Sequence, residues 1–384
     1  MSQVSTPTQP IPWEAQPPSV TPAKAAAAGG RIYALDGLRL IAAVVVMLFH
    51  FLGVDAALKA HWEQSPKVFA PNAFGVAVYG HYGVQLFFLI SGFVICMSAW
   101  GRTPRQFVSA RFVRLFPAYW VSVVAVALLW RLLPDGQRRV PSLSESLANL
   151  TMIQKALGAR NLAGVYWTLW VELCFYLLFL IVVWKGLTYA RVSWFAWLWL
   201  LGSTLVPGNS DVVPLYEIFA SPGNAPFFVG GIGMYLLYRF GPDLQSVCLV
   251  AASWLVAQYE TYVSLRIKAA EAKAGAFVEN PYIAVAVITG CFLIVLAIAL
   301  HLLDGVKWRW LATAGALSYP LYLIHAEFGW AVIRVLDDRI GVWPTVVVAC
   351  VSMMVAAALL HWCAEKPLAR RVRRAVDRVG TRHG

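Results

Sequence analysis

The chain has 384 residues, of which 60% are hydrophobic and only 13% are charged. A soluble globular protein carries about 25% charged residues and about 45–50% apolar ones. One soluble core also could not hide so many apolar stretches of the length that crosses a bilayer. The composition therefore excludes an ordinary soluble domain and predicts an all-α, polytopic integral membrane protein.

The net charge of +12 raises the question of a nucleic-acid partner. The basic residues gather in short segments between apolar stretches and at the C-terminus. Cytoplasmic loops of membrane proteins carry this excess of Lys and Arg. The distribution favours contact with the lipid bilayer, and no nucleic-acid partner is expected.

The N-terminal segment over residues 1–30 is rich in Pro, Ala, Thr and Gln and has almost no charge. It lacks the basic start and apolar stretch of a cleaved signal. We expect a disordered tail over 1–30. A transmembrane domain is expected over 31–363, and a basic cytoplasmic tail over 364–384.

The first predicted span covers residues 35–54, with Asp36 expected as the residue that caps its helix. The second covers 81–100 and the third 118–132. The segment between these two spans contains four arginines and no acidic residue, so we interpret it as a cytoplasmic loop. This orientation places the N-terminus in the cytoplasm.

Seven further spans bring the expected total to about ten transmembrane helices, with both termini cytoplasmic. They are predicted at 166–184, 192–206, 224–238, 244–262, 281–303, 310–336 and 342–363. The ninth contains Pro320, and we expect this proline to interrupt its helix, because proline lacks an N–H group and clashes with the preceding turn.

Two ionisable residues stand out in the first span, where charge is costly and marks a candidate functional site. Arg39 and His50 lie 11 positions apart in an otherwise apolar run. At about 100° and about 1.5 Å per residue, both project from one helix face, about 16 Å apart along its axis. The spacing leaves two interpretations open: both line one cavity, or Arg39 reaches lipid headgroups and His50 is merely hydrogen-bonded.

A shared cavity would suit the transfer of an acyl group from a thioester to an alcohol. His50 can accept the hydroxyl proton, because an unperturbed imidazole changes charge near neutral pH. Arg39 stays charged and can bind phosphate or stabilise an oxyanion.

Arg111 and Arg114 lie in the predicted cytoplasmic loop and share a face if that segment is helical. Such a pair suits the phosphates of a coenzyme A nucleotide. Ordinary positive-inside charge is the alternative.

Two further ionisable residues have structural and functional interpretations of similar weight. Glu172 needs a partner if it is buried, and Arg39 or Arg114 could supply one. His325 follows Pro320, where a broken backbone could open a polar pocket; a packed histidine that bonds a neighbouring helix is the alternative.

Motifs of other enzyme classes are absent from the sequence. It contains no Walker loop, no GxSxG elbow, no HExxH and no paired metal-binding cysteines. We therefore expect no metal and no bound cofactor, with acyl-CoA as the donor substrate.

The chain resembles the acyltransferase-3 family of bacterial transmembrane O-acyltransferases through six motifs in the family's order. They are Leu35-Asp36-Gly37-Leu38-Arg39 with His50, residues 83–93, Arg111-Phe112-Val113-Arg114, residues 167–176, a weaker match at Phe227-Phe228-Val229-Gly230-Gly231, and residues 317–325. Each motif alone is modestly specific, but six in the right order are hard to explain by chance.

The resemblance implies roles for particular residues. According to this resemblance, His50 is the catalytic base and Arg39 is its essential partner. Arg111 and Arg114 help to bind acyl-CoA. The supporting residues are Ser91, Glu172, Tyr319 and His325.

The resemblance also implies a substrate class and a location. An acyl group, with acetyl expected, passes from acyl-CoA to a carbohydrate acceptor such as lipopolysaccharide, exopolysaccharide or an oligosaccharide. The expected location is the bacterial inner (plasma) membrane. A transporter that exports a glycan or small metabolite is the alternative from another class, because it also needs polar residues in a cavity; a non-catalytic scaffold is a third.

Overall fold

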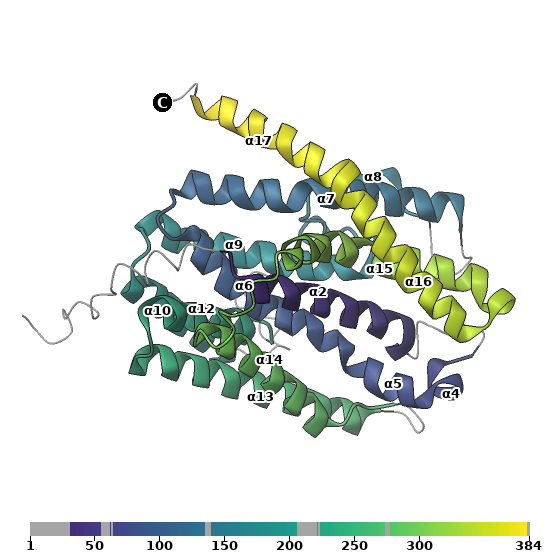
Figure 1. Cartoon of the computed structure of the whole chain (residues 1–384), viewed down its shortest axis with the longest axis horizontal. Coiled ribbons are helices and arrows are strands. Elements are labelled where there is room, and N and C mark those ends of the chain that lie inside the picture. Colours follow the sequence, from purple (N-terminus) through teal and green to yellow (C-terminus); the bar gives the residue numbers. More distant parts are fainter. Residues whose placement is uncertain are drawn as a thin grey trace, which may run out of the picture.

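The computed structural model describes residues 31–54, 62, 64–134, 140–205, 221, 223–272 and 277–381. Every regular element in these residues is a helix, and they contain no strand (Figure 1). The predicted all-α fold class is confirmed. The expected disordered tail over 1–30 and the last three residues of the basic tail lie outside the described residues.

The first half of the chain alternates long helices with short helical turns. Its elements are α2 (Tyr33–Leu48), the π-helical turn η2 (Phe49–Gly53), α4 (Pro66–Phe69), α5 (Pro71–Ala77), the 3-10 turn η3 (Val78–Tyr82), α6 (Gly83–Ala99), α7 (Pro104–Leu132), α8 (Leu143–Leu150) and the 3-10 turn η4 (Gly164–Tyr166).

The second half is built in the same way and ends in a basic helix. Its elements are α9 (Trp167–Lys185), α10 (Tyr189–Leu205), α12 (Ala225–Phe240), α13 (Leu244–Glu271), α14 (Pro281–Ala299), α15 (Trp310–Ile340), α16 (Val342–Leu359), the π-helical turn η5 (Leu360–Glu365) and α17 (Lys366–Thr381).

Several of these helices have the length and composition of membrane spans. Six described segments qualify: Tyr33–Gly53, Pro71–Ala99, Pro104–Leu132, Gly164–Lys185, Pro281–Ala299 and Val342–Ala375. α10 and α12, with 17 and 16 residues, lie at or below the lower limit of about 17 residues for a crossing. The chain is a multi-pass membrane protein, while the count of ten and the side of each terminus stay predictions.

The N-terminal cap predicted for the first span is wrong. α2 begins at Tyr33, four residues earlier than a cap at Asp36 requires. Asp36 lies in the first turn, where its carboxylate accepts a hydrogen bond from Arg31 Nε at 2.6 Å. A carboxylate in the first turn is favourable because it faces the positive end of the helix dipole.

The predicted cytoplasmic loop before the third span is also wrong in its structure. α7 already begins at Pro104, because the Thr103 side chain accepts a hydrogen bond from Gln106 N and the Gln106 side chain accepts one from Thr103 N. This reciprocal capping starts a helix efficiently. α7 then continues through Pro117, so the two arginines of the motif lie inside a 29-residue helix.

Pro320 does not interrupt the ninth predicted span. α15 runs for 31 residues with this proline inside it. Neighbouring helices can compensate for one missing hydrogen bond in a membrane protein, and α15 packs along both α2 and α16.

α6 and α12 pack closely against each other. A Cβ atom at Gly92 would overlap the backbone of Phe228, and one at Gly231 would overlap the backbone of Leu89. Small residues let membrane helices approach this closely. The motifs at 83–93 and Phe227–Gly231 therefore contain the glycines that join these two helices.

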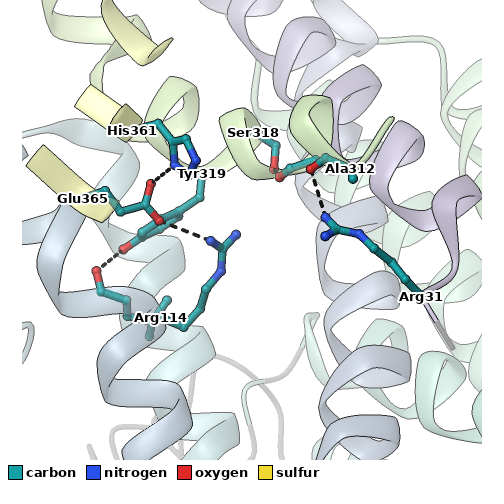
Figure 2. A network of polar contacts seen from close by, with 9 residues as sticks. Arg31, Arg114, Ala312, Ser318, Tyr319, His361 and Glu365 are labelled. Atoms are coloured by element: carbon teal, nitrogen blue, oxygen red, sulfur yellow. Dashed lines mark hydrogen bonds and ion pairs between the residues drawn. The ribbon is translucent and has the colours of Figure 1, made fainter. Parts of the chain in front are cut away.

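α15 is the element around which the candidate site is built. It packs against α2, α7 and α16. Arg31 Nη2 donates a further hydrogen bond to Ala312 O at 2.9 Å, which ties the start of α2 to α15 (Figure 2). α17, the yellow helix of Figure 1, packs on α7.

Candidate active site

α2 carries Arg39, and the turn η2 that directly follows it carries His50; the sequence singled out both residues. Arg39 lines a cavity together with Tyr319 of α15, and His50 contacts His325 and Trp330 of the same helix. Both side chains therefore turn toward α15. His50 lies in the π-helical turn η2, a local geometry that is frequent at functional sites.

His50 and His325 form a close pair between α2 and α15. His50 Nδ1 lies 3.1 Å from His325 Nε2, and the two rings meet edge to face with centroids 4.9 Å apart. His50 Nδ1 also lies 2.9 Å from Val46 O. Trp330 Nε1 donates a hydrogen bond to His50 O at 2.9 Å, which fixes the backbone beneath the ring.

A cavity of about 590 Å³ lies where α7, α15, η5 and α17 meet. Its lining is strongly cationic, with seven Arg or Lys residues against two Glu residues. The cations are Arg39, Arg102, Arg111, Arg114, Lys366, Arg370 and Arg373. We call this space the cationic cavity.

Two of these arginines have buried nitrogen atoms without a hydrogen-bond partner among the described residues. They are Arg39 Nε and Arg111 Nε. Buried polar groups are nearly always paired in proteins. The two N–H groups are therefore donors that a ligand in the cationic cavity can satisfy.

Arg111 and Arg114 project from one face of α7 and have different partners. Arg111 Nη2 donates a hydrogen bond to Ser98 Oγ at 2.9 Å. Arg114 Nη1 lies 3.3 Å from Glu365 Oε1, and its guanidinium lies 5.5 Å from the centre of the Tyr319 ring. The predicted shared face is observed, although Arg114 is already paired with a carboxylate.

Glu365 is a site residue that the sequence analysis missed. It is buried, and its second oxygen lies 2.7 Å from His361 Nδ1. Figure 2 shows Arg114, Glu365 and His361 pointing toward one another, with Tyr319 beside them. The π-helical turn η5 places both His361 and Glu365.

The cations of α17 were also missed, because the sequence analysis treated residues 364–384 as a general basic tail. Lys366, Arg370 and Arg373 line the cationic cavity. The spacing of these residues, at i, i+4 and i+7, is the pattern of one helix face. That spacing is the sequence signal that could have found them.

Glu172 lies at the inner end of the cationic cavity. Its Oε1 accepts hydrogen bonds from Ser91 Oγ at 3.1 Å and from Tyr176 OH at 2.5 Å. Arg114, one of its two predicted partners, pairs with Glu365 instead. Two hydroxyl donors therefore bond one oxygen of the Glu172 carboxylate, and Ser91 is one of them.

A narrow second cavity, of about 50 Å³, adjoins the first. We call it the passage. The residues that line both spaces are Arg39, Ser91, Glu172 and Tyr319. The passage also reaches Tyr322, whose ring centroid is 5.6 Å from that of His325. The cationic cavity therefore continues through the passage toward the histidine pair.

The described residues contain no group of three or more His, Cys, Asp or Glu side chains that could hold an ion.

A family model described as an acyltransferase domain matches residues 32–362 of this chain. The chain belongs to the acyltransferase-3 family. The match includes Arg39, His50, both arginines of α7 and His325, and it ends before Glu365 and α17.

Nodulation protein 10 of Rhizobium leguminosarum bv. viciae is 29% identical over 218 residues, which cover 50% of this chain and 56% of that protein. The similarity to this relative thus spans about half of each chain. No solved structure matches the chain.

Proposed function

We propose that this member of the acyltransferase-3 family transfers an acyl group, with acetyl expected, from acyl-CoA to a hydroxyl of a cell-envelope or secreted glycan. A location in the inner membrane of a bacterium is part of the proposal. The observation that carries it is the cationic cavity, which adjoins a passage lined by Tyr322; the ring of Tyr322 lies 5.6 Å from that of His325, the partner of His50.

The cationic cavity suits the nucleotide of coenzyme A. That nucleotide carries a pyrophosphate and a 3′-phosphate, and arginine binds phosphate through paired N–H donors. The unpartnered Nε groups of Arg39 and Arg111 supply donors for it. The exposed cations of α17 complete the wall on the side that opens to solvent.

The passage suits the pantetheine arm, which is a thin chain that ends in the thioester. Arg39 lies where the cationic cavity and the passage join. It lies about 16 Å along the helix axis from His50, because 11 residues of helix separate them. This distance favours a role for Arg39 in holding the donor over a role at the reacting carbonyl.

The acyl transfer itself takes place at His50. His50 accepts the proton of the glycan hydroxyl while the hydroxyl oxygen attacks the thioester carbonyl carbon. The carbon–sulfur bond then breaks and the coenzyme A thiolate leaves. His50 then returns the proton to this thiolate, which gives the free coenzyme A thiol and restores His50 as a base.

The test uses the full chain in isolated membranes supplied with radiolabelled acetyl-CoA. The readout is label in alkali-labile esters of the envelope glycan fraction. His50→Ala should lower the rate by about 10²- to 10⁴-fold, the contribution of a positioned general base. His301→Ala is the matched control, since His301 pairs with Asp304 and lines neither the cationic cavity nor the passage.

Two outcomes would contradict the proposal. Wild-type incorporation in the His50→Ala membranes would remove the base from the mechanism. Movement of glycan across the membrane without consumption of acetyl-CoA would support the transporter instead.

A further inference from the structure

We propose that His325 is a positioning residue that holds His50 in one tautomer, with Nδ1 protonated and Nε2 free to accept the substrate proton. This inference depends on the proposed function, because it takes His50 as the base. It identifies Nε2 as the reacting atom of His50, and it gives His325 of α15 the task of orienting that ring.

The hydrogen bonds of His325 determine its own tautomer. Its Nδ1 lies 2.9 Å from Tyr322 O and 3.1 Å from Leu321 O. A carbonyl oxygen can only accept, so Nδ1 must carry the hydrogen. In the neutral imidazole, Nε2 is then an acceptor, and this atom is the one that points at His50.

The same reasoning then determines the tautomer of His50. Its Nδ1 lies 2.9 Å from Val46 O and 3.1 Å from His325 Nε2. Both neighbours are acceptors, so Nδ1 of His50 must be a donor. The hydrogen of neutral His50 is therefore on Nδ1, and its Nε2 keeps a free lone pair.

The alternative assignment is unfavourable at every contact. If His50 carried its hydrogen on Nε2, the bare Nδ1 would face the carbonyl oxygen of Val46 and the lone pair of His325 Nε2. Turning His325 into its other tautomer would supply a donor to His50, but its bare Nδ1 would then face two carbonyl oxygens. Each buried acceptor that is left without a donor lowers the stability of the fold by about 1–3 kcal/mol.

The surroundings keep His325 in this geometry. The side chain is fully buried. α15 and α2 pack along each other, and the Trp330 bond to His50 O anchors the π-helical turn from the same helix. A histidine oriented by a hydrogen bond at its other ring nitrogen is the general way in which proteins select a tautomer.

His325 differs from the carboxylate that orients the histidine in serine hydrolases. A neutral imidazole adds no negative charge to stabilise protonated His50. Its effect is therefore on orientation and tautomer, and Val46 O keeps part of that effect if His325 is lost. We expect a loss of about 10- to 100-fold, as is typical when a partner that orients a functional histidine is removed.

The first measurement is the tautomer itself. The full chain, with its seven histidines labelled with 15N, is studied by NMR in lipid nanodiscs at neutral pH. A His50→Gln spectrum identifies the His50 signals by subtraction. We expect a protonated Nδ1 and a bare Nε2 in the wild-type protein; a protonated Nε2 would overturn the inference.

The second measurement separates the hydrogen bond from packing. His325→Gln can place an amide oxygen near the position of Nε2, whereas His325→Met fills similar space without an acceptor. We expect His325→Met to lower kcat by about 10- to 100-fold, with KM for acetyl-CoA within about twofold, and His325→Gln to recover most of kcat. Equal activity of the two variants would overturn the inference.

These results can be told apart from failure of the proposed function. If His50 is not the base, His50→Ala stays active and both His325 variants leave kcat unchanged. If His50 is the base but His325 does not orient it, His50→Ala is inactive while His325→Met keeps its rate. The wild-type tautomer is measured in either case and needs no variant of His325 to fold.

Discussion

Removal of two cations from α17 should weaken the binding of the acyl-CoA nucleotide. Arg370 and Arg373 line the cationic cavity, whereas Arg371 and Arg374 are exposed on the same helix and do not line it. The double variant Arg370→Gln/Arg373→Gln and the double variant Arg371→Gln/Arg374→Gln therefore remove equal charge from two faces of one helix that lie about 100° apart.

The size of the effect follows from the exposure of these side chains. Two unit charges about 4 Å apart attract by about 1 kcal/mol in water and by about 4 kcal/mol near a protein surface. Arg370 and Arg373 are exposed, so the lower figure applies. Two such contacts amount to about 2 kcal/mol, which is about a 30-fold rise in KM for acetyl-CoA.

The assay measures thiol release by the full chain in isolated membranes, which supply the glycan acceptor, with acetyl-CoA or with acetyl-pantetheine, which lacks the nucleotide. We expect the cavity variant to raise KM only for acetyl-CoA, and the control variant to change KM by less than about threefold. The difference should shrink as salt rises, because the Debye length falls from about 10 Å at 0.1 M to about 3 Å at 1 M.

Two results would refute this reasoning. An equal rise in KM for both double variants would show that only the overall positive charge of α17 matters. A rise that persists with acetyl-pantetheine would show that the arginines support the fold or the passage and not the phosphates.

Three further predictions concern the packing of α12 and the inner part of the site. Gly231→Ala should lower the melting temperature in detergent, because the new Cβ overlaps the backbone of α6 and overpacking costs about 1–3 kcal/mol. Gly290→Ala is the control and should not lower it, because a Cβ at Gly290 meets nothing within 4 Å. An equal fall in melting temperature for both variants would contradict the packing argument. Glu365→Gln should release Arg114 from its ion pair and lower KM for acetyl-CoA by up to about fivefold, since partly exposed ion pairs contribute about 0–1 kcal/mol. A higher KM would show instead that Glu365 positions the arginine. Arg39→Lys should raise KM for acetyl-CoA and leave turnover of acetyl-pantetheine unchanged, because lysine lacks the paired donors of arginine. A fall in kcat with both substrates would place Arg39 at the reacting carbonyl.

The sequence by itself determined the class of the protein and the first helix of the site. Its composition required helices in a membrane, because only closed hydrogen-bonded structures are stable in lipid. The 11-residue spacing of Arg39 and His50 required a common helix face. Properties of this kind depend on residues close together in the chain, so periodicity and hydropathy are enough to find them.

Some helix boundaries lay beyond this reasoning. Pro320 was expected to interrupt its helix, yet it lies inside α15, as Pro117 lies inside α7. The sequence rule counts the hydrogen bond that a proline removes. It does not include packing from neighbouring helices, which keeps the helix intact.

Only the tertiary structure decided the partners of the site residues. Arg114 meets Glu365 across 251 positions of chain, and His50 meets His325 across 275. α17 closes the cationic cavity because it packs back on α7. Which face of a helix meets which neighbour depends on how all the helices fit together, and the spacing of residues along one helix carries no information about that fit.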